Sequence, residues 1–231
     1  MKKQTVQSAQ AQKYKDYSLF SRYGILSIIV LFVICFSLAS PAFMTARNWS
    51  SLIVGQVAVA CIALGAICPM IAGEFDFSVG YTIGLLAIIG ANTAQHTDSA
   101  VLVIASVLLS GILIGLINGC ISILLKISST VVTLGMGLVY YGVNMAISDG
   151  RTITGNIPEI LKVIAKTKFL NFNLSVWIIV VMALVLWYVM ERTPFGKQIY
   201  AVGLCERAAY LSGIRTKFTK ILSFALCDVC I

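Results

Sequence analysis

The stretch AVLVIASVLLSGILIGLINGCISILL, residues 100–125, runs for 26 residues without a charged side chain. A helix that crosses the hydrocarbon core of a bilayer needs about 20 predominantly apolar residues, so this stretch is long enough for one span. The rest of the chain has the same character, since 59% of its 231 residues are hydrophobic and only 11% are charged. Soluble domains carry about 25% charged residues. We therefore expect an integral membrane protein.

Apolar stretches on both sides of this one predict an all-α, polytopic helix bundle with six full spans and the start of a seventh. The expected spans are residues 25–46, 50–72, 77–94, 100–125, 129–148 and 173–190, with a partial span at 219–231. The first apolar run is longer than the core of a signal peptide, about 7–15 residues, so it is expected to remain as an uncleaved span. Residues 1–24 form a polar tail, and residues 25–231 form one transmembrane domain that includes a loop at 191–218.

The 17 Lys and Arg residues are distributed unevenly between the two sides of this arrangement. Twelve fall on the side of the N-terminal tail, Lys126 and the 191–220 segment, and five fall on the other side. Because basic residues collect on the cytoplasmic side, we expect a multi-pass protein of the cell (inner or plasma) membrane with a cytoplasmic N terminus. The same rule accounts for the net charge of +8, so nucleic-acid binding is not expected.

Residues suited to catalysis or metal binding are few and scattered. His96 is the only histidine, and Cys227 and Cys230 form a C-x-x-C without a second pair or a nearby His. No G-x-x-x-x-G-K-[ST] nucleotide-binding loop is present. We expect no enzyme activity, no metal and no cofactor, and any use of ATP requires a partner chain.

Two of the expected spans carry a patterned face. Gly111, Gly115 and Gly119 recur at intervals of four, which lets a neighbouring helix approach closely, and Asn118 is placed to hydrogen-bond across that contact. In the span 129–148, one helical face carries small and polar residues. These are Thr133, Gly137, Tyr140 or Tyr141, and Asn144. Thr133, Gly137, Tyr141 and Asn144 either pack against other helices or line a translocation path. A path lined by such neutral groups suits a neutral polar solute.

The segment GEFDFSVG, residues 73–80, places Glu74 and Asp76 in apolar surroundings. Charges at membrane depth are costly, and irregular backbone is tolerated there only inside protein or beside a wet cavity. The segment is either a tight cytoplasmic turn or a broken helix partly inside the membrane. A structural role is expected, in which the carboxylates complement the dipole of the following helix and Ser78 caps it. A proton or cation relay and a contact with a partner are the alternatives.

The segment 191–220 contains an apolar stripe at helical spacing, which predicts an amphipathic helix that begins near Leu204 and stops at Gly213. The stripe consists of Ala201, Leu204, Ala208, Leu211 and Ile214. Such a helix either lies on lipid headgroups or docks in a groove on another protein. The stripe is built from small and aliphatic residues without Trp or Phe, which favours docking.

Three stretches together resemble one family. TPFGKQIYAVGLCERAAYLSGI, residues 193–214, is similar to the cytoplasmic coupling loop of ribose-type permeases of bacterial ATP-binding-cassette (ABC) importers. GEFDFSVG resembles the G-G-x-D-[LF]-S-V-G segment of these permeases, and residues 118–154 resemble their N-G to T-L-G stretch. The matches occur in the family's order over residues 50–225, which makes them more specific together than any one alone.

The resemblance implies the membrane-spanning subunit of an importer for a neutral, ribose-like monosaccharide. Its partners are then a cytoplasmic ABC ATPase, an extracytoplasmic sugar-binding protein and a second permease copy in a homo- or heterodimer. The coupling loop is implied to sit in a cleft on the ATPase through Phe195, Gly196, Tyr200, Gly203, Glu206, Ala208, Ala209, Leu211, Ser212 and Gly213. The family motif before the third span falls on Gly73, Asp76, Ser78 and Gly80.

The sequence departs from the family at three points. Cys205 stands where the family often has Asn, and Glu74 stands where it has a second Gly. Members of the family continue for several spans beyond Ile231, so we expect a C-terminally truncated chain. The alternative function is an ion-coupled secondary transporter of a small polar solute, with Asp76 as its relay.

Overall fold

The computed structural model describes residues 23–151, 153, 158–169 and 172–231. The chain divides into two units, residues 1–52 and 53–231, which are treated separately here. The described part of the first unit contains an apolar helix, Tyr23–Ala39, and most of α2 (Ala46–Gly55). The expected N-terminal tail lies almost entirely outside the described residues.

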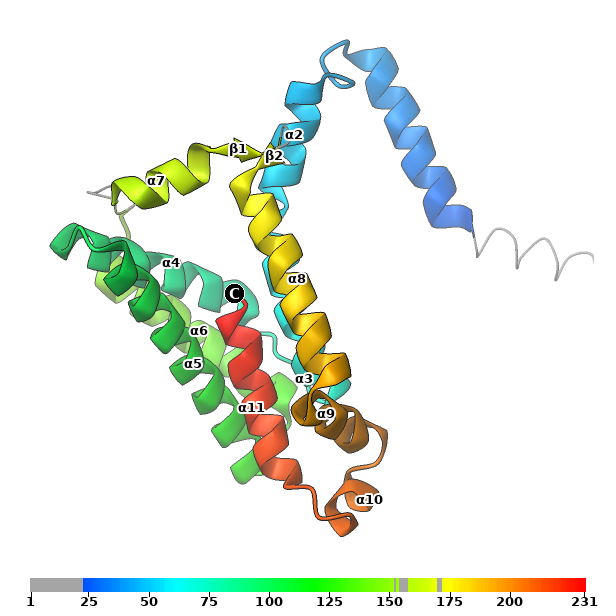
Figure 1. Ribbon diagram of the computed structural model, residues 1–231, viewed down its shortest axis with the longest axis vertical. Coiled ribbons are helices and arrows are strands. Elements are labelled where there is room, and N and C mark those ends of the chain that lie inside the picture. The colour runs from blue at the N-terminus through cyan, green and yellow to red at the C-terminus, as the bar shows by residue number, and fades with distance from the viewer. Residues whose placement is uncertain (1–22, 152, 154–157, 170–171) are drawn as a thin grey trace, which may run out of the picture. The chain divides into compact units, whose positions relative to one another are not determined.

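The second unit is built from helices, as the sequence predicts (Figure 1). The helices are α3 (Val57–Ile71), α4 (Val79–His96), α5 (Ala100–Leu124), α6 (Ser129–Ser148), α7 (Glu159–Lys166), α8 (Leu174–Arg192), α9 (Pro194–Leu204), α10 (Glu206–Leu211) and α11 (Thr216–Val229). Two short strands, β1 (Lys168–Phe169) and β2 (Phe172–Asn173), pair antiparallel just before α8.

Three helices of the described chain, α5, α6 and α8, are long and apolar enough to cross a membrane, and α2 and α3 together form a fourth candidate broken at Gln56. These four correspond to expected spans. The other two full spans are not confirmed. The helix Tyr23–Ala39 is short for a crossing. Helix α4 is less apolar than a helix that crosses a membrane, because its last turns carry Asn92, Thr93 and His96.

The most extensive helix packing in the second unit joins α5 to α11. A Cβ atom added to Gly115 would lie 2.5 Å from the Cα of Ala225, and one added to Gly119 would lie 2.9 Å from the Cα of Ile221. On the opposite side of α11, a Cβ atom on Gly65 of α3 would lie 2.6 Å from the carbonyl oxygen of Cys227. The predicted close approach at the α5 stripe is therefore confirmed, and its partner is the helix expected as a partial span.

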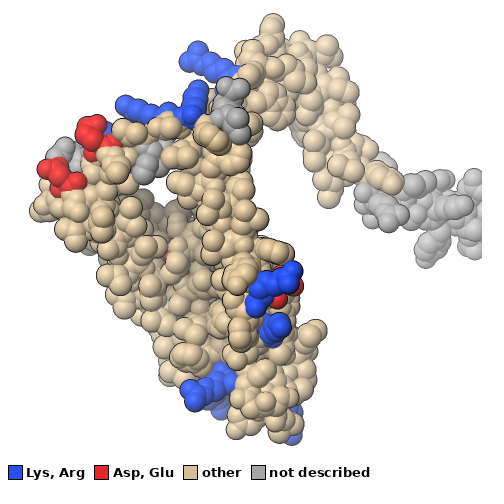
Figure 2. Space-filling view, viewed as in Figure 1, with Lys and Arg blue, Asp and Glu red and all other residues tan. Residues whose placement is uncertain are grey.

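Charged side chains of the second unit gather near its two ends (Figure 2). Lys162 and Lys166 lie on α7, whereas Lys197 and Arg207 lie on α9 and α10. The surface between them is tan in this view and carries exposed apolar side chains of α5 and α8. A wide apolar band between two charged ends is typical of a bundle surrounded by lipid.

Candidate functional site

Residues 74–78 form a segment without regular secondary structure, called the extended segment here, which follows the turn at Ala72 and Gly73 and connects α3 to α4. Gly73 has a φ of +84°, a left-handed conformation that favours glycine. Its N–H donates to the carbonyl of Met70 at 3.1 Å, and the N–H of Glu74 donates to that of Pro69 at 2.9 Å. This pair of bonds is a Schellman motif, which satisfies the last carbonyls of α3 and redirects the chain.

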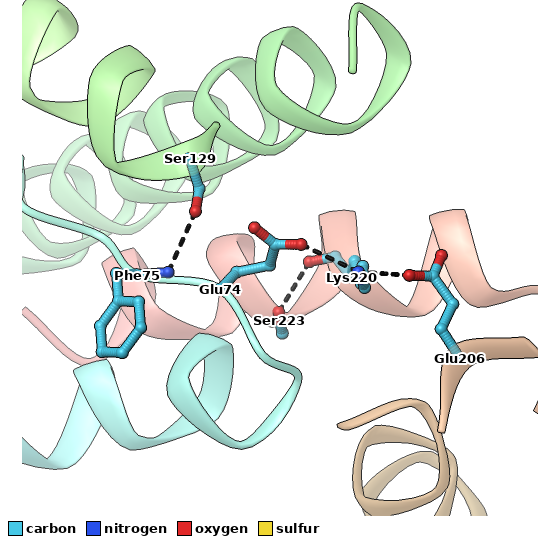
Figure 3. Close-up of polar contacts among 6 residues, drawn as sticks. All are labelled: Glu74, Phe75, Ser129, Glu206, Lys220 and Ser223. Carbon is cyan, nitrogen blue, oxygen red and sulfur yellow. Dashed lines mark hydrogen bonds and ion pairs between the residues drawn. The ribbon is translucent and has the colours of Figure 1, made fainter. Parts of the chain in front are cut away.

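Side chains of α6 satisfy the backbone of the extended segment. The N–H of Phe75 donates to Ser129 Oγ at 3.1 Å, and the N–H of Phe77 donates to Thr133 Oγ1 at 3.0 Å. Figure 3 shows the first of these bonds, from Ser129 on α6 to Phe75. The segment is irregular backbone that α6 hydrogen-bonds, with Asp76 and Ser78 buried and the rings of Phe75 and Phe77 about half exposed. Both interpretations of residues 73–80, a tight cytoplasmic turn and a broken helix partly inside the membrane, stay predictions.

Asp76 is the centre of a buried hydrogen-bond network. Its Oδ1 atom accepts from the N–H of Ser78 at 2.8 Å and from Ser78 Oγ at 2.6 Å. Asn118 Nδ2 donates to Ser78 Oγ at 2.9 Å and to Asp76 Oδ2 at 3.4 Å, and Tyr140 OH donates to Asn118 Oδ1 at 2.7 Å. All four residues are buried. The network therefore links the segment to α5 and α6.

Two expectations for this region are wrong. Ser78 occupies the N-cap position of α4 without a capping bond, because its hydroxyl is committed to Asp76. Asn118 makes its recorded bonds to the extended segment and to α6, rather than across the glycine contact with α11.

A second carboxylate, on α11, lies beside Asp76. One oxygen of Asp76, one oxygen of Asp228 and the sulfur of Cys227 all lie within 4.8 Å of one another. Sequence reasoning does not bring these residues together, because Asp76 and Asp228 are far apart in the chain. The signal was present, since an acidic residue inside an apolar helix is unusual and calls for a partner.

The predicted polar face of α6 lies against α4. A Cβ atom on Gly137 would lie 2.6 Å from the ring of Tyr81, and Asn144 Nδ2 lies 3.2 Å from the position of a Cβ atom on Gly84. The ring of Tyr141 stacks edge-on to that of Tyr81 at 6.2 Å and is 50% exposed. Of the two adjacent tyrosines, Tyr140 therefore points into the protein and Tyr141 points out.

An ion-pair cluster joins the extended segment to the 191–218 loop. Lys220 Nζ, near the start of α11, lies 2.9 Å from Glu74 Oε1 and 2.8 Å from Glu206 Oε2 (Figure 3). The side chains of Lys220 and Glu74 are mostly buried, at 12% and 16% exposed. Glu74 thus pairs with a lysine of α11 and provides a link to the start of α10.

The 191–218 loop contains two helices. Cys205 adopts extended backbone, with φ −159° and ψ 100°, and separates α9 from α10. The helix predicted to begin near Leu204 is α10, which begins two residues later with Glu206 in its first turn, and the additional helix α9 precedes it. The predicted stop at Gly213 is confirmed, since Gly213 has φ +86° and the N–H of Ile214 donates to the carbonyl of Ala209 at 3.1 Å. Among the predicted coupling residues, Gly196 and Ala209 are buried, Phe195 is half-buried, and Tyr200, Gly203, Glu206, Ala208, Leu211, Ser212 and Gly213 are exposed.

Helix α9 is packed tightly onto the bundle. Thr193 Oγ1 accepts from the N–H of Gly196 at 3.3 Å at the start of the helix, and Ile199 is fully buried. The backbone of Gly203 lies directly against the last carbonyl of α3, that of Ile71, where any side chain would collide. A displacement of α9 toward this contact would therefore also displace the end of α3.

Tyr200, also on α9, is 38% exposed, and its hydroxyl donates to Glu191 Oε1 at 3.3 Å. Desolvation, together with the adjacent Glu191 carboxylate, raises the pKa of Tyr200 above its ordinary value. The phenol therefore stays neutral and remains a donor.

Large apolar side chains stand exposed at the tip of the loop, on what we call the α9–α10 surface. Leu204 is 87% exposed, Leu211 78% and Tyr210 68%. Arg207, within α10, adds positive charge. Exposed apolar patches rimmed by charged or polar residues are typical of interaction surfaces.

Comparison with known proteins identifies the family of this chain. The family model described as "Branched-chain amino acid transport system / permease component" matches residues 48–230. The chain belongs to this permease family. The resemblance predicted from three sequence stretches is thereby confirmed, and permeases of this kind are transport components rather than enzymes.

Several curated permeases are similar to the chain along most of its length. The D-allose transport system permease protein AlsC of Escherichia coli is 28% identical over 228 residues, which cover 96% of this chain and 69% of the relative. The L-arabinose ABC transporter permease protein AraH of Azospirillum brasilense is 29% identical, over 91% of this chain and 62% of the relative. The ribose import permease protein RbsC of Haemophilus influenzae is 30% identical, over 90% and 65%.

The chain thus spans roughly two thirds of the length of these permeases. No solved structure matches it.

Proposed function

We propose that the chain forms part of the membrane-spanning permease of an ABC importer that moves a neutral, ribose-like monosaccharide across the cell membrane. Membership of the permease family supports this proposal, as do the relatives named for allose, arabinose and ribose. Its partners are an ABC ATPase on the cytoplasmic side, an extracytoplasmic sugar-binding protein and a second permease copy. An ion-coupled transporter is not favoured, because these relatives are importer permeases.

The α9–α10 surface is the observation that carries the proposal. Leu204 and Leu211 are the most exposed of its apolar side chains, and the helices that present them are short. A short helix with exposed aliphatic groups fits a groove on a partner protein, which here is the ATPase. The N terminus and this surface then lie on the cytoplasmic side, in agreement with the Lys and Arg distribution.

Two contacts are suited to transmit movement of the ATPase into the bundle. Gly203 presses on the end of α3, and Lys220 ties Glu206 of α10 to Glu74 of the extended segment. Both contacts converge on residues 71–74, next to the buried network of Asp76. A displacement of α9 and α10 therefore shifts the segment that α5 and α6 hold in place.

We propose that the translocation path runs along the side of α6 that carries Thr133, Gly137, Tyr141 and Asn144. Tyr141 and Asn144 have accessible side chains, whereas Thr133 and Gly137 fix the extended segment and Tyr81 behind them. These neutral donors, acceptors and rings match a sugar better than an ion.

Substitution of Leu211 by Asp tests the coupling role. Affinity purification of the wild-type chain from native membranes is expected to bring down an ABC ATPase, identified by mass spectrometry, and Leu211→Asp is expected to lower its yield at least about tenfold because a charge enters an apolar contact. Val163→Asp on α7, 57% exposed at the other end of the unit, is the matched control and keeps the ATPase. Equal yields from both variants would remove the docking claim.

A further inference from the structure

Asp228 is a buried carboxylate. The residue is 1% exposed, and neither of its carboxylate oxygens has a hydrogen-bond partner among the residues that the structure describes. Asp76 beside it is partly compensated by donors from Ser78 and Asn118. An ionised carboxylate without donors or a counter-charge is costly in an apolar interior, so Asp228 calls for a positively charged partner.

The protein supplies no such cation among the described residues. The lysines in ion pairs are Lys162, which binds Glu159, and Lys220, which binds Glu74 and Glu206. Neither reaches Asp228. The compensating charge must therefore come from a proton or from a bound ion.

The third member of the group is a thiol. The sulfur of Cys227 lies within 4.8 Å of one oxygen of Asp76 and of one oxygen of Asp228, and all three residues are buried. Carboxylate and thiolate donors together suit borderline divalent transition metals, whereas Mg²⁺ and Ca²⁺ prefer six or more oxygen ligands. A proton shared by the two carboxylates needs no sulfur ligand, whereas a transition metal does use one.

The backbone around the group is held on two sides. A Cβ atom on Gly65 of α3 would lie 2.6 Å from the carbonyl oxygen of Cys227, and one on Gly111 of α5 would lie 2.6 Å from that of Asp228. Asn118 fixes Asp76 from a third direction. The donor side chains are therefore presented by packed helices, as metal sites require.

We propose that Asp76, Asp228 and Cys227 form a binding site for Zn²⁺ or a chemically similar divalent transition metal. With Zn–O distances of about 2.0 Å and Zn–S distances of about 2.3 Å, the ligand atoms of a tetrahedral site lie about 3.3–3.5 Å apart. Side-chain rotations that move each ligand atom by roughly 1 Å therefore bring the three atoms into this geometry. Water takes the fourth position. The bound ion joins α11 to the extended segment and neutralises the carboxylates that face each other there.

Metal titration of the purified chain in detergent tests the site. The chain is expected to bind one Zn²⁺ with a rise in melting temperature, and Mg²⁺ at the same concentration is expected to leave that temperature unchanged. Substitution with Co²⁺ is expected to give a near-ultraviolet thiolate-to-cobalt absorption band. Asn118→Ala, which removes a donor to Asp76, is expected to weaken Zn²⁺ binding about 10- to 100-fold.

Three variants make the assignment specific. Cys227→Ser is expected to abolish the cobalt band, while Cys230→Ser, a matched change on the same turn of chain outside the group, keeps it. Asp228→Asn replaces an uncompensated buried charge by a neutral isostere, so it folds without metal and loses the Zn²⁺-dependent rise in melting temperature. Absence of Zn²⁺ binding, equal stabilisation by Mg²⁺, or a cobalt band that survives Cys227→Ser would each overturn the proposal; the first outcome leaves a shared proton as the partner of the two carboxylates.

Discussion

Single residues at the centre of the bundle connect elements that are distant in sequence. Lys220 holds Glu74 and Glu206 at 2.9 and 2.8 Å, and Asn118 accepts from Tyr140 while donating to Ser78. In both cases one polar side chain serves two partners. Removal of that side chain therefore leaves two groups without compensation, which is more damaging than loss of a single bond.

Replacement of Lys220 by Met should destabilise the protein by about 1–3 kcal/mol, less than the loss of a fully buried pair because Glu206 is half exposed. Thermal unfolding in detergent measures the effect. Lys217→Met, an exposed lysine on the same helix, serves as control and should have little effect. Adding Glu74→Gln to Lys220→Met should restore part of the stability, since it removes the carboxylate left unpaired; no restoration would argue against the ion pair.

Replacement of Tyr140 by Phe should destabilise the protein by about 1–3 kcal/mol, because Asn118 Oδ1 loses its buried donor. The neighbouring change Tyr141→Phe should be close to neutral for stability, since Tyr141 is half exposed. Thermal unfolding of the two variants compares them directly. A larger loss from Tyr141→Phe would contradict the placement of the two rings.

The sequence predicted part of this residue-scale picture. The polar face containing Thr133 follows from helical spacing, and the structural importance of Asp76 follows from the cost of a charge in apolar surroundings. The partners could not be predicted, because contacts between Asp76 and Asp228 or Glu74 and Lys220 depend on how α11 packs. Helical spacing also left Tyr140 and Tyr141 undecided, since adjacent residues differ by only about 100° around a helix.

At the scale of elements, glycines decide how closely the helices of the second unit approach. Gly111, Gly115 and Gly119 bring α5 into backbone contact with α11, and Gly65 does the same from α3. Helices without a hydrophobic driving force between them associate through such close packing. The position of α11 in turn determines where Lys220 and Asp228 lie.

Replacement of Gly115 by Leu should separate α5 from α11 and destabilise the protein by about 3 kcal/mol or more, because the new Cβ would meet the backbone of Ala225 at 2.5 Å. Gly135→Leu on α6 is the matched control, since no atom lies within 4 Å of its Cβ position. Size-exclusion chromatography and thermal unfolding in detergent report the difference. Equal behaviour of the two variants would contradict the α5–α11 packing.

Small-residue spacing predicted that some helix approaches α5, but the spacing carries no information about which one. The sequence also did not predict that a separate helix, α9, precedes α10. Residues Ala201 to Ile214 keep an apolar spacing that continues across Cys205, so periodicity alone cannot reveal the change of direction there. Gly213 was predicted correctly because glycine has a specific role at helix C termini.

At the scale of the whole molecule, the second unit has charged regions near its two ends and a lipid-facing middle, and its family is a permease family. Composition predicted this class, since no soluble domain of this size contains so much apolar sequence. The number of spans was less predictable. Helix α4 follows irregular backbone, and the polar residues in its last turns make it less apolar than α5, α6 and α8.

The central claim of this account is that the α9–α10 surface faces the cytoplasm, where a motor protein can engage it. The direct test labels a variant whose only cysteine is Cys205, exposed in the structure, with a membrane-impermeant maleimide in right-side-out vesicles. Cys205 should react only after the vesicles are permeabilised, whereas V163C in a cysteine-free background, on α7 at the opposite end, should react at once. Labelling of Cys205 in sealed vesicles would place the surface outside and contradict the account.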